Sequence, residues 1–188
     1  ALGAVGLVRG QAHQVDRQFF EVDRDLAAEL DALSPHFIRS GKGHGEREHS
    51  LEVQLPFLQH KLGNHLRMVP LVLGIRDPGE CFRLAEALQP WFNGKNLFVI
   101  SSDFSHYPDY RDAQTTDKAT TEAILSNSPE QLLKRLELNS NLNIPGLATS
   151  LCGWTSVLTL LYLTAGKAFS YHWTDYQNSG DQPLYGDH

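Results

Sequence analysis

The stretch LFVISSDFSHY, between Leu97 and Tyr107, joins a hydrophobic run to a cluster of reactive side chains. The apolar residues, suited to a buried strand, stop at Ser101, and an acid and an imidazole, Asp103 and His106, follow three residues apart. An imidazole can pass a proton to or from a ligand near neutral pH, and a neighbouring carboxylate can fix its tautomer. The stretch therefore predicts an acid/base pair. The simpler interpretation is that Asp103 caps a turn and His106 lines a loop.

Three other places hold residues that could share in such chemistry. His49 and Glu52 lie three residues apart on one predicted helical face, a spacing that supports metal ligation or an acid/base pair but is also common in surface contacts. Cys152 starts a predicted helix, where the helix dipole favours a thiolate, the form that binds metals and attacks electrophiles. A buried, inert cysteine is the competing interpretation. The polar run Asp175 to Asp181 is most simply a turn.

The elements that must position these residues alternate between helices and strands. Leucines at helical spacing predict helices over 22–33 and 49–62, with Asp23 capping the first and Pro56 kinking or breaking the second. Further helices are predicted over 77–92, 112–125, 129–138 and 152–166, and strands over 67–74, 96–103 and 168–180. Within the strand over 67–74, Pro70 indicates an edge or a bulge. This alternation predicts an α/β fold with a mixed or mostly parallel sheet flanked by helices.

The predicted architecture brings the reactive residues together. In open α/β sheets, ligand sites form at the carboxyl ends of the strands, and the segment that starts at Ser101 follows such an end. We therefore expect Asp103, His106 and Cys152 to face one cavity, with His49 at its edge.

The overall composition narrows the classes of function. The chain has 188 residues, 41% of them hydrophobic and 20% charged, which is ordinary for one compact globular domain. A net charge of −6 without any block of like charges argues against a nucleic-acid partner. Two cysteines fit a reducing cytoplasm, and the longest apolar run, around 157–163, is shorter than the roughly 20 residues that cross a bilayer. We expect a soluble, cytoplasmic protein that contacts neither nucleic acid nor membrane.

Five motifs together resemble the Memo family, whose members are related in fold to the class III extradiol dioxygenases. In chain order the motifs read EHSLEVQLPFLQ, VPLVLG, LFVISSDFSHY, CGW and YQNSGD. The resemblance covers nearly the whole chain from about Asp23 onward. It implies an α/β fold of the class III extradiol dioxygenase type around a non-haem metal pocket.

The resemblance also implies roles for individual residues. In the family, the metal is held by two N-terminal histidines, in motifs that read roughly APHAGY and GPSH, and by the cysteine of the CGW motif, which matches Cys152. His106 resembles the histidine that acts as acid/base beside the iron centre of the related dioxygenases. Residue chemistry makes Asp103, which could fix the tautomer of this ring, its expected catalytic partner. The pocket residues expected in addition are His49, Glu52 and Ser102.

The sequence departs from the family pattern near both ends. It contains neither N-terminal histidine motif, and the last strand expected after YQNSGD is missing. We therefore expect a single Memo-like domain over residues 1–188 that is incomplete at its N-terminus and at its last strand. Iron or copper is the cofactor implied for the complete family protein, and this chain, with one of three family ligands, should bind it weakly or not at all. A sheet without its first strands should present an unpaired edge, which favours a homo-oligomer or another protein partner.

Three functions fit these residues and the resemblance. The first is an iron or copper redox pocket, as in a metal-dependent, dioxygenase-like oxidoreductase, although a cysteine in place of the carboxylate of the usual iron triad departs from dioxygenase chemistry. The second, suggested by the family, is a non-enzymatic module that binds a phosphotyrosine peptide or a partner protein in signalling. The third is an enzyme with Cys152 as nucleophile, assisted by His106 and Asp103. The pocket ligand is a small molecule or a peptide, and the sequence does not decide between enzyme and binding module.

Overall fold

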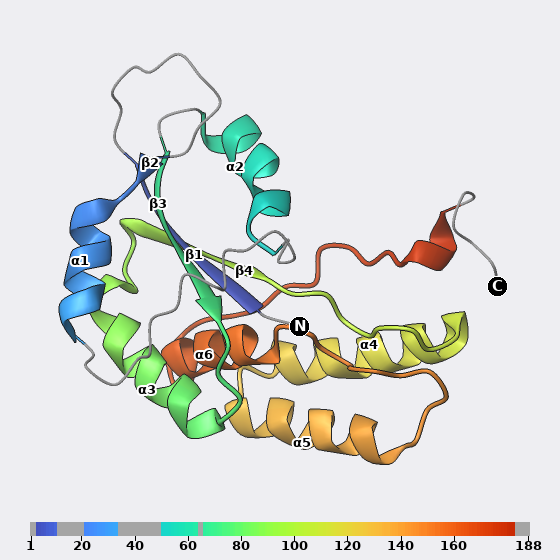
Figure 1. The fold of residues 1–188 in the computed structure, drawn as a ribbon. Coiled ribbons are helices and arrows are strands. Elements are labelled where there is room, and N and C mark those ends of the chain that lie inside the picture. The colour runs from blue at the N-terminus through green and yellow to red at the C-terminus, as the bar shows by residue number, and fades with distance from the viewer. Residues whose placement is uncertain (1–2, 11–20, 34–49, 64–65, 183–188) are drawn as a thin grey trace. The chain divides into compact units, whose positions relative to one another are not determined.

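The computed structural model describes residues 3–10, 21–33, 50–63 and 66–182 of the chain (Figure 1). These residues belong to two compact units. The first unit consists of the chain up to Ser102 together with Gly153–Leu163, and the second consists of Asp103–Cys152 and the chain from Thr164 onward. That residues 1–188 form a single domain stays a prediction.

A mixed four-stranded sheet forms the centre of the first unit. Its strand order is β2-β3-β1-β4. β1 is antiparallel to both β3 and β4, and the short β2 is parallel to β3. The strands are β1 Gly3–Gly10, β2 Glu21–Val22, β3 Leu66–Leu73 and β4 Asn96–Ser101. The predicted α/β fold with a mixed sheet is confirmed. The sequence does not predict β1, because Gly3, Gly6 and Gly10 interrupt its apolar pattern and glycine is depleted in strands.

Helices cover both faces of this sheet. Successive side chains of a strand point to opposite faces, so neighbouring residues of β3 pack against different helices. On one face, Leu66 and Met68 of β3 pack with Val99 of β4 against α2. On the other face, Val69 and Leu73 of β3 belong to a larger core with residues of α1, α3 and α6. The helices of this unit are α1 Arg24–Leu33, α2 Leu55–Leu62, α3 Pro78–Leu88 and α6 Trp154–Thr164, which ends one residue past the unit, with short 3-10 helices at Glu52–Gln54 and Gln89–Trp91.

Local sequence sets where these helices begin. Asp23 caps α1 as predicted, since its side chain accepts a hydrogen bond from the Leu26 N–H at 3.0 Å. Asp77 caps α3 through a backbone N–H of the first turn, at 3.1 Å. Pro56 lies in the first turn of α2, directly after the 3-10 helix Glu52–Gln54, so the predicted break in this helical stretch is confirmed.

Pro70 lies in β3, opposite Gly6 of β1. β2 pairs with β3 only at Arg67 and Met68, so on that side β3 has no strand neighbour at Pro70 within the described part of the chain. A proline is tolerated where one side of a strand is unpaired, because no ladder hydrogen bond is lost there. The predicted edge position of Pro70 is therefore confirmed for this side of β3.

α6 is apolar on almost all sides and is correspondingly buried. Leu158 and Leu161 have no exposed surface, and even Ser156 and Thr159 of this helix are buried. The helix is followed by Gly166 in the left-handed conformation, with φ of +71°, which is the helix end that the sequence predicts. Over the ranges that the structure describes, no helix combines the length and the apolar composition needed to cross a bilayer.

The second unit contains a pair of packed helices, α4 Tyr110–Leu125 and α5 Pro129–Asn141. Asp109 and Ser128 cap their first turns. Between the helices, the buried side chain of Asn139 donates a hydrogen bond to Thr120 Oγ1 at 3.0 Å. α4 therefore turns polar as well as apolar side chains toward the interior.

The strand predicted over 168–180 is wrong. This segment is irregular and ends in a 3-10 helix at Ser179–Asp181. Its tyrosines bind side chains instead of a neighbouring strand: the hydroxyl of Tyr171 lies 2.7 Å from Thr164 Oγ1, and that of Tyr176 donates to Asp117 at 2.8 Å. An alternation of apolar and polar residues leads to a strand only where a second strand supplies the backbone hydrogen bonds.

Candidate functional site

The segment that follows β4 is fixed against the segment that precedes α6. The Asp103 N–H donates a hydrogen bond to Cys152 Sγ at 3.1 Å, and the Cys152 N–H donates to the Asp103 carbonyl oxygen at 3.0 Å. This reciprocal pair places two residues that are 49 positions apart in direct contact. The cysteine sulfur therefore has a fixed position next to the loop that carries His106.

A second pair of backbone hydrogen bonds fixes His106. Its N–H donates to the Thr149 carbonyl oxygen, and its own carbonyl oxygen accepts from the Ala148 N–H, both at 3.0 Å. The next residue, Tyr107, has a φ of +69°, a conformation that non-glycine residues rarely adopt. Gly146, with φ of +77°, approaches the Tyr107 carbonyl so closely that any Cβ at position 146 would collide with it. The His106 backbone is thus held by a close contact that only glycine permits.

These constraints bring three predicted site residues together. The ligand atoms of Asp103, His106 and Cys152 all lie within 4.8 Å of one another. His106 Nε2 is 3.6 Å from Asp103 Oδ2, which is an ion-pair distance when the imidazole is protonated and is too long for a hydrogen bond. The Asp103 side chain is 84% exposed, and His106 and Cys152 are half-buried. We call these three residues the DHC cluster. Their roles in catalysis and metal binding stay predictions.

The DHC cluster offers a chemically suitable donor set for a first-row metal. Thiolate, imidazole and carboxylate are ligands of zinc, iron and copper. Donors around a tetrahedral metal at the usual bond lengths lie about 3.4–3.8 Å apart. The three ligand atoms lie within 4.8 Å of one another, so some of them would have to approach by up to about 1 Å to share one metal. The donor types suit a metal, and Cys152 is the donor that matches a ligand of the family.

The remaining predicted pocket residues are not part of this cluster. Ser102 Oγ accepts a hydrogen bond from the Gly153 N–H at 2.8 Å, which ties the end of β4 to the start of α6 within the first unit. Glu52 belongs to the 3-10 helix before α2, and its side chain lies outside the described residues, as does all of His49. Their predicted place at the edge of the pocket stays a prediction.

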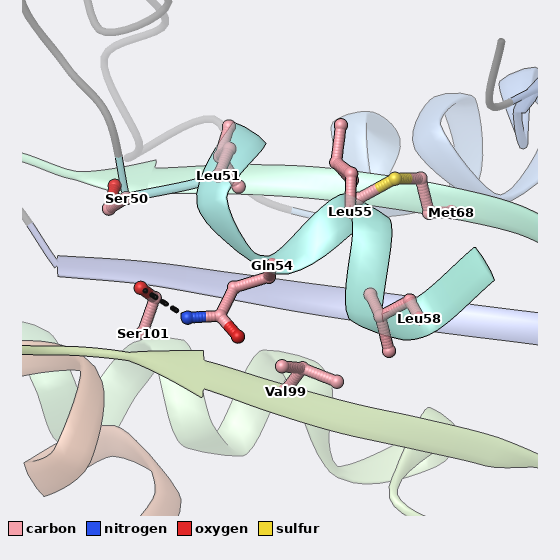
Figure 2. A pocket seen from close by; sticks show the side chains of 8 residues that line it. All are labelled: Ser50, Leu51, Gln54, Leu55, Leu58, Met68, Val99 and Ser101. Atoms are coloured by element: carbon pink, nitrogen blue, oxygen red, sulfur yellow. Dashed lines mark hydrogen bonds between the residues drawn. The ribbon is translucent and has the colours of Figure 1, made fainter. Parts of the chain in front are cut away.

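A separate, apolar pocket lies in the first unit (Figure 2). The residues that line it are Ser50, Leu51, Gln54, Leu55, Leu58, Met68, Val99 and Ser101. Figure 2 shows Gln54 reaching from the helical segment to the end of β4, where its Nε2 donates to Ser101 Oγ at 3.1 Å. About 240 Å³ of empty space lies within the pocket, a volume that includes space open to solvent. The pocket lies between α2 and the sheet.

Sequence reasoning missed Asp117 of α4. Its side chain is only 3% exposed, and it accepts hydrogen bonds from the Ser105 N–H at 2.9 Å and from the Tyr176 hydroxyl at 2.8 Å. The available signal was helical spacing, because Ala113, Asp117 and Thr120 fall on one face of the helix. A charged residue on the apolar face of a helix indicates a buried partner.

Comparisons with known proteins agree with the motifs. The family model described as "Memo-like protein" matches residues 19–187. A MEMO1 family protein of Thermoplasma acidophilum is 31% identical over 156 residues, which cover 83% of this chain and 54% of that protein. A MEMO1 family protein of Methanosarcina barkeri is 32% identical over 167 residues (86% of this chain and 58% of that protein). One of Thermotoga sp. is 37% identical over 140 residues (72% and 47%).

The chain spans about half the length of these relatives. No solved structure matches it. The family model nevertheless extends over nearly all of the sequence, including the cluster residues Asp103, His106 and Cys152. The chain therefore belongs to the family of Memo-like proteins.

Proposed function

We propose that the DHC cluster is part of a non-haem metal pocket with redox chemistry, in which the metal is iron or copper and the ligand is a small molecule. The observation that carries the proposal is the approach of carboxylate, imidazole and thiolate to within 4.8 Å of one another. Backbone hydrogen bonds of Asp103, His106 and Cys152 hold the three side chains in this arrangement.

Cys152 is the metal ligand in this proposal. The Asp103 N–H donates a hydrogen bond to Sγ at 3.1 Å, which fixes the position of the sulfur. A thiolate suits copper and iron, and it replaces the carboxylate that the usual iron triad of dioxygenases would contribute. Ring cleavage of the dioxygenase type is therefore not part of the proposal.

His106 is the proton-transfer residue, and Asp103 orients it. The imidazole takes a proton from a ligand hydroxyl or returns it, and its Nε2 lies 3.6 Å from the Asp103 carboxylate. Asp103 stabilises the imidazolium that forms during this transfer. A bound iron or copper ion would supply Lewis-acid and one-electron chemistry next to this group.

Metal titration of the 188-residue chain tests the assignment. Cobalt(II) and copper(I), added without oxygen, report a bound thiolate through a ligand-to-metal charge-transfer band. We expect weak binding in the unaltered chain, since the resemblance supplies only one of three family ligands. Cys152→Ser should abolish the band, and His106→Gln should leave it in place.

The second cysteine provides the matched control. Cys81 has no exposed surface, and burial raises the pKa of its thiol to about 11. Cys81→Ser should therefore leave the band unchanged. Tight metal binding that survives dialysis against a chelator and is lost in His106→Gln would contradict the assignment and make His106 a ligand.

A cysteine-nucleophile enzyme is the second candidate, because the same three side chains and the partial exposure of Cys152 also suit nucleophilic attack. Iodoacetamide distinguishes the two candidates. A chain that binds no metal but alkylates at Cys152 far faster than at Cys81, and slows on His106→Gln, favours the nucleophile. A chain that shows neither behaviour but binds a phosphotyrosine peptide favours a binding module.

A further inference from the structure

A buried hydrogen-bond network surrounds Asp117, close to the loop that carries the DHC cluster. Asp117 lies in the middle of α4 and is almost completely buried, yet both groups that donate to it are neutral: a backbone N–H and a tyrosine hydroxyl. Burying a carboxylate costs free energy, and hydrogen bonds must offset that cost. An alanine or threonine at this position would support the helix without the cost of burying a charge. The contacts of the carboxylate should therefore explain its presence.

The first contact reaches the loop of the DHC cluster. Ser105 lies between Asp103 and His106, and its N–H donates to Asp117 Oδ1 at 2.9 Å. Asp103 is already paired with Cys152, and His106 with Thr149. The bond to Asp117 fixes the backbone between these two anchors, at the point that sets the spacing of the carboxylate and the imidazole.

The second contact reaches the YQNSGD motif. Asp117 Oδ2 accepts from the Tyr176 hydroxyl, which also accepts from Asn178 Nδ2 at 3.1 Å. Burial, more than any single contact, raises the pKa of Tyr176 to about 12, so the hydroxyl keeps its proton at neutral pH and remains a donor. The motif thus supplies the second donor that the buried carboxylate needs.

The rest of the motif is folded onto the start of α4. The Asn178 N–H donates to Asp181 Oδ2 at 2.8 Å, and the other oxygen of Asp181 accepts from the Tyr110 hydroxyl at 2.6 Å. A Cβ at Gly180 would overlap the ring of Tyr110. The motif that the sequence predicts as a simple turn therefore makes several contacts with the start of α4, and these contacts hold Tyr176 in place.

We infer that Asp117 is a positioning residue for the DHC cluster, and that Tyr176 locks Asp117 in the orientation that holds the Ser105 N–H. This inference rests on the proposed function for the meaning of the cluster, but its geometry is independent of metal. Asp117 acts through the backbone on the position of His106 relative to Asp103.

The test compares three variants of the 188-residue chain by NMR. Asp117→Ala removes both acceptors, Asp117→Asn keeps one acceptor for the Ser105 N–H, and Tyr176→Phe removes only the lock. Hydrogen exchange of the Ser105 amide should accelerate by about tenfold or more in Asp117→Ala, which is the effect of losing one hydrogen bond to a carboxylate. It should stay within about threefold of the unaltered chain in Asp117→Asn and be intermediate in Tyr176→Phe.

The 15N chemical shifts of the His106 ring separate positioning from general stability. These shifts should differ from those of the unaltered chain in Asp117→Ala and equal them in Asp117→Asn. The control is Thr120→Val, which removes a buried hydrogen bond that Asn139 donates to the same helix, without touching the loop. It should destabilise the chain and leave the His106 shifts in place. Equal shifts in Asp117→Ala and Thr120→Val would overturn the positioning role.

Ser105→Ala is a second control, because the Ser105 hydroxyl has no hydrogen-bond partner in the described part of the chain, and the variant keeps the N–H that binds Asp117. In this variant, hydrogen exchange of the backbone amide at position 105 should be as fast as in the unaltered chain. If Asp117→Ala does not fold, Asp117→Asn and Tyr176→Phe carry the test. A cobalt–thiolate band that persists in Cys152→Ser would contradict the proposed function alone. Unchanged exchange at Ser105 in Asp117→Ala and Tyr176→Phe would contradict the positioning role alone.

Discussion

Side chains form the apolar pocket, whereas backbone hydrogen bonds hold the residues of the DHC cluster in place. The pocket is formed by packed side chains, with one side-chain hydrogen bond between Gln54 and Ser101 (Figure 2). The cluster depends on backbone groups, since the N–H groups of Asp103, His106 and Cys152 are all hydrogen-bonded. Its side chains are then left partly or largely exposed. The comparison indicates that pocket side chains contribute mainly to stability, whereas cluster side chains remain available for chemistry.

The largest expected effect is on the pocket side. Met68 is 6% exposed and packs with Leu66 beneath α2. Met68→Ala should lower the free energy of unfolding by about 2–5 kcal/mol, because it enlarges a cavity in the core. Urea denaturation measures this loss, and the alkylation rate of Cys152 in the native protein should not change.

Val53→Ala is the control for this prediction. Val53 is apolar but 49% exposed, so its truncation should cost less than about 0.5 kcal/mol. Equal losses of stability in Met68→Ala and Val53→Ala would break the comparison, because the pocket side chains would then contribute no more than surface residues.

The next effect concerns the backbone that holds the cluster. Gly146→Ala forces a Cβ against the Tyr107 carbonyl in addition to the cost of a positive φ. Gly166→Ala carries the cost of φ alone, about 1–2 kcal/mol, since no atom lies within 4 Å of its added Cβ. We expect Gly146→Ala to be the more destabilising by roughly 1–3 kcal/mol and to shift the ring resonances of His106. Identical unfolding free energies in the two variants would show that the close contact at Tyr107 does not constrain the cluster.

A smaller effect appears at alkaline pH. The folded-state pKa of Tyr176 is about 12, above the ordinary value of 10, chiefly because the phenol is buried. The stability that this group contributes is therefore complete below about pH 10 and is lost as the pH rises toward 12. Phenolate absorbance should show a tyrosine that titrates near pH 12 and is missing from Tyr176→Phe. In the control Tyr171→Phe, which removes a hydroxyl bound to Thr164, that late titration should persist.

The fold could be predicted to the extent that local pattern decides it. Leucine spacing and caps locate α1, with Asp23 at its start, because helix periodicity and capping act over a few residues. The strand predicted over 168–180 fails because no local signal tells whether a second strand is present to pair with Tyr171 and Tyr176. β1 is missed for the converse reason, since its glycines weaken the strand pattern and its two neighbours in the sheet determine its conformation.

The candidate site shows the same division. Asp103, His106 and Cys152 are found from residue type and from family motifs, and the structure places their ligand atoms together. Asp117 could not be identified, because its importance comes from the Ser105 N–H and the Tyr176 hydroxyl, contacts of long range in sequence. Side chains of reactive types such as cysteine and histidine stand out in a sequence, whereas a buried acid such as Asp117 differs from a surface acid only in its spacing on the helix.

The smallest expected effect on stability is at the cluster itself, and it is the sharpest test of the comparison. Asp103 has an 84% exposed side chain, and exposed charge contacts such as the one it makes with His106 contribute little to stability. Asp103→Asn should change the free energy of unfolding by less than about 0.5 kcal/mol. The same substitution at Asp23 should cost about 1–3 kcal/mol, because Asp23 is 1% exposed, caps α1 and pairs with Arg67 at 2.9 Å. Paired urea titrations of the two variants measure the difference. A large loss of stability in Asp103→Asn would mean that the Asp103 side chain holds the loop, and the division between stabilising pocket and reactive cluster would not hold.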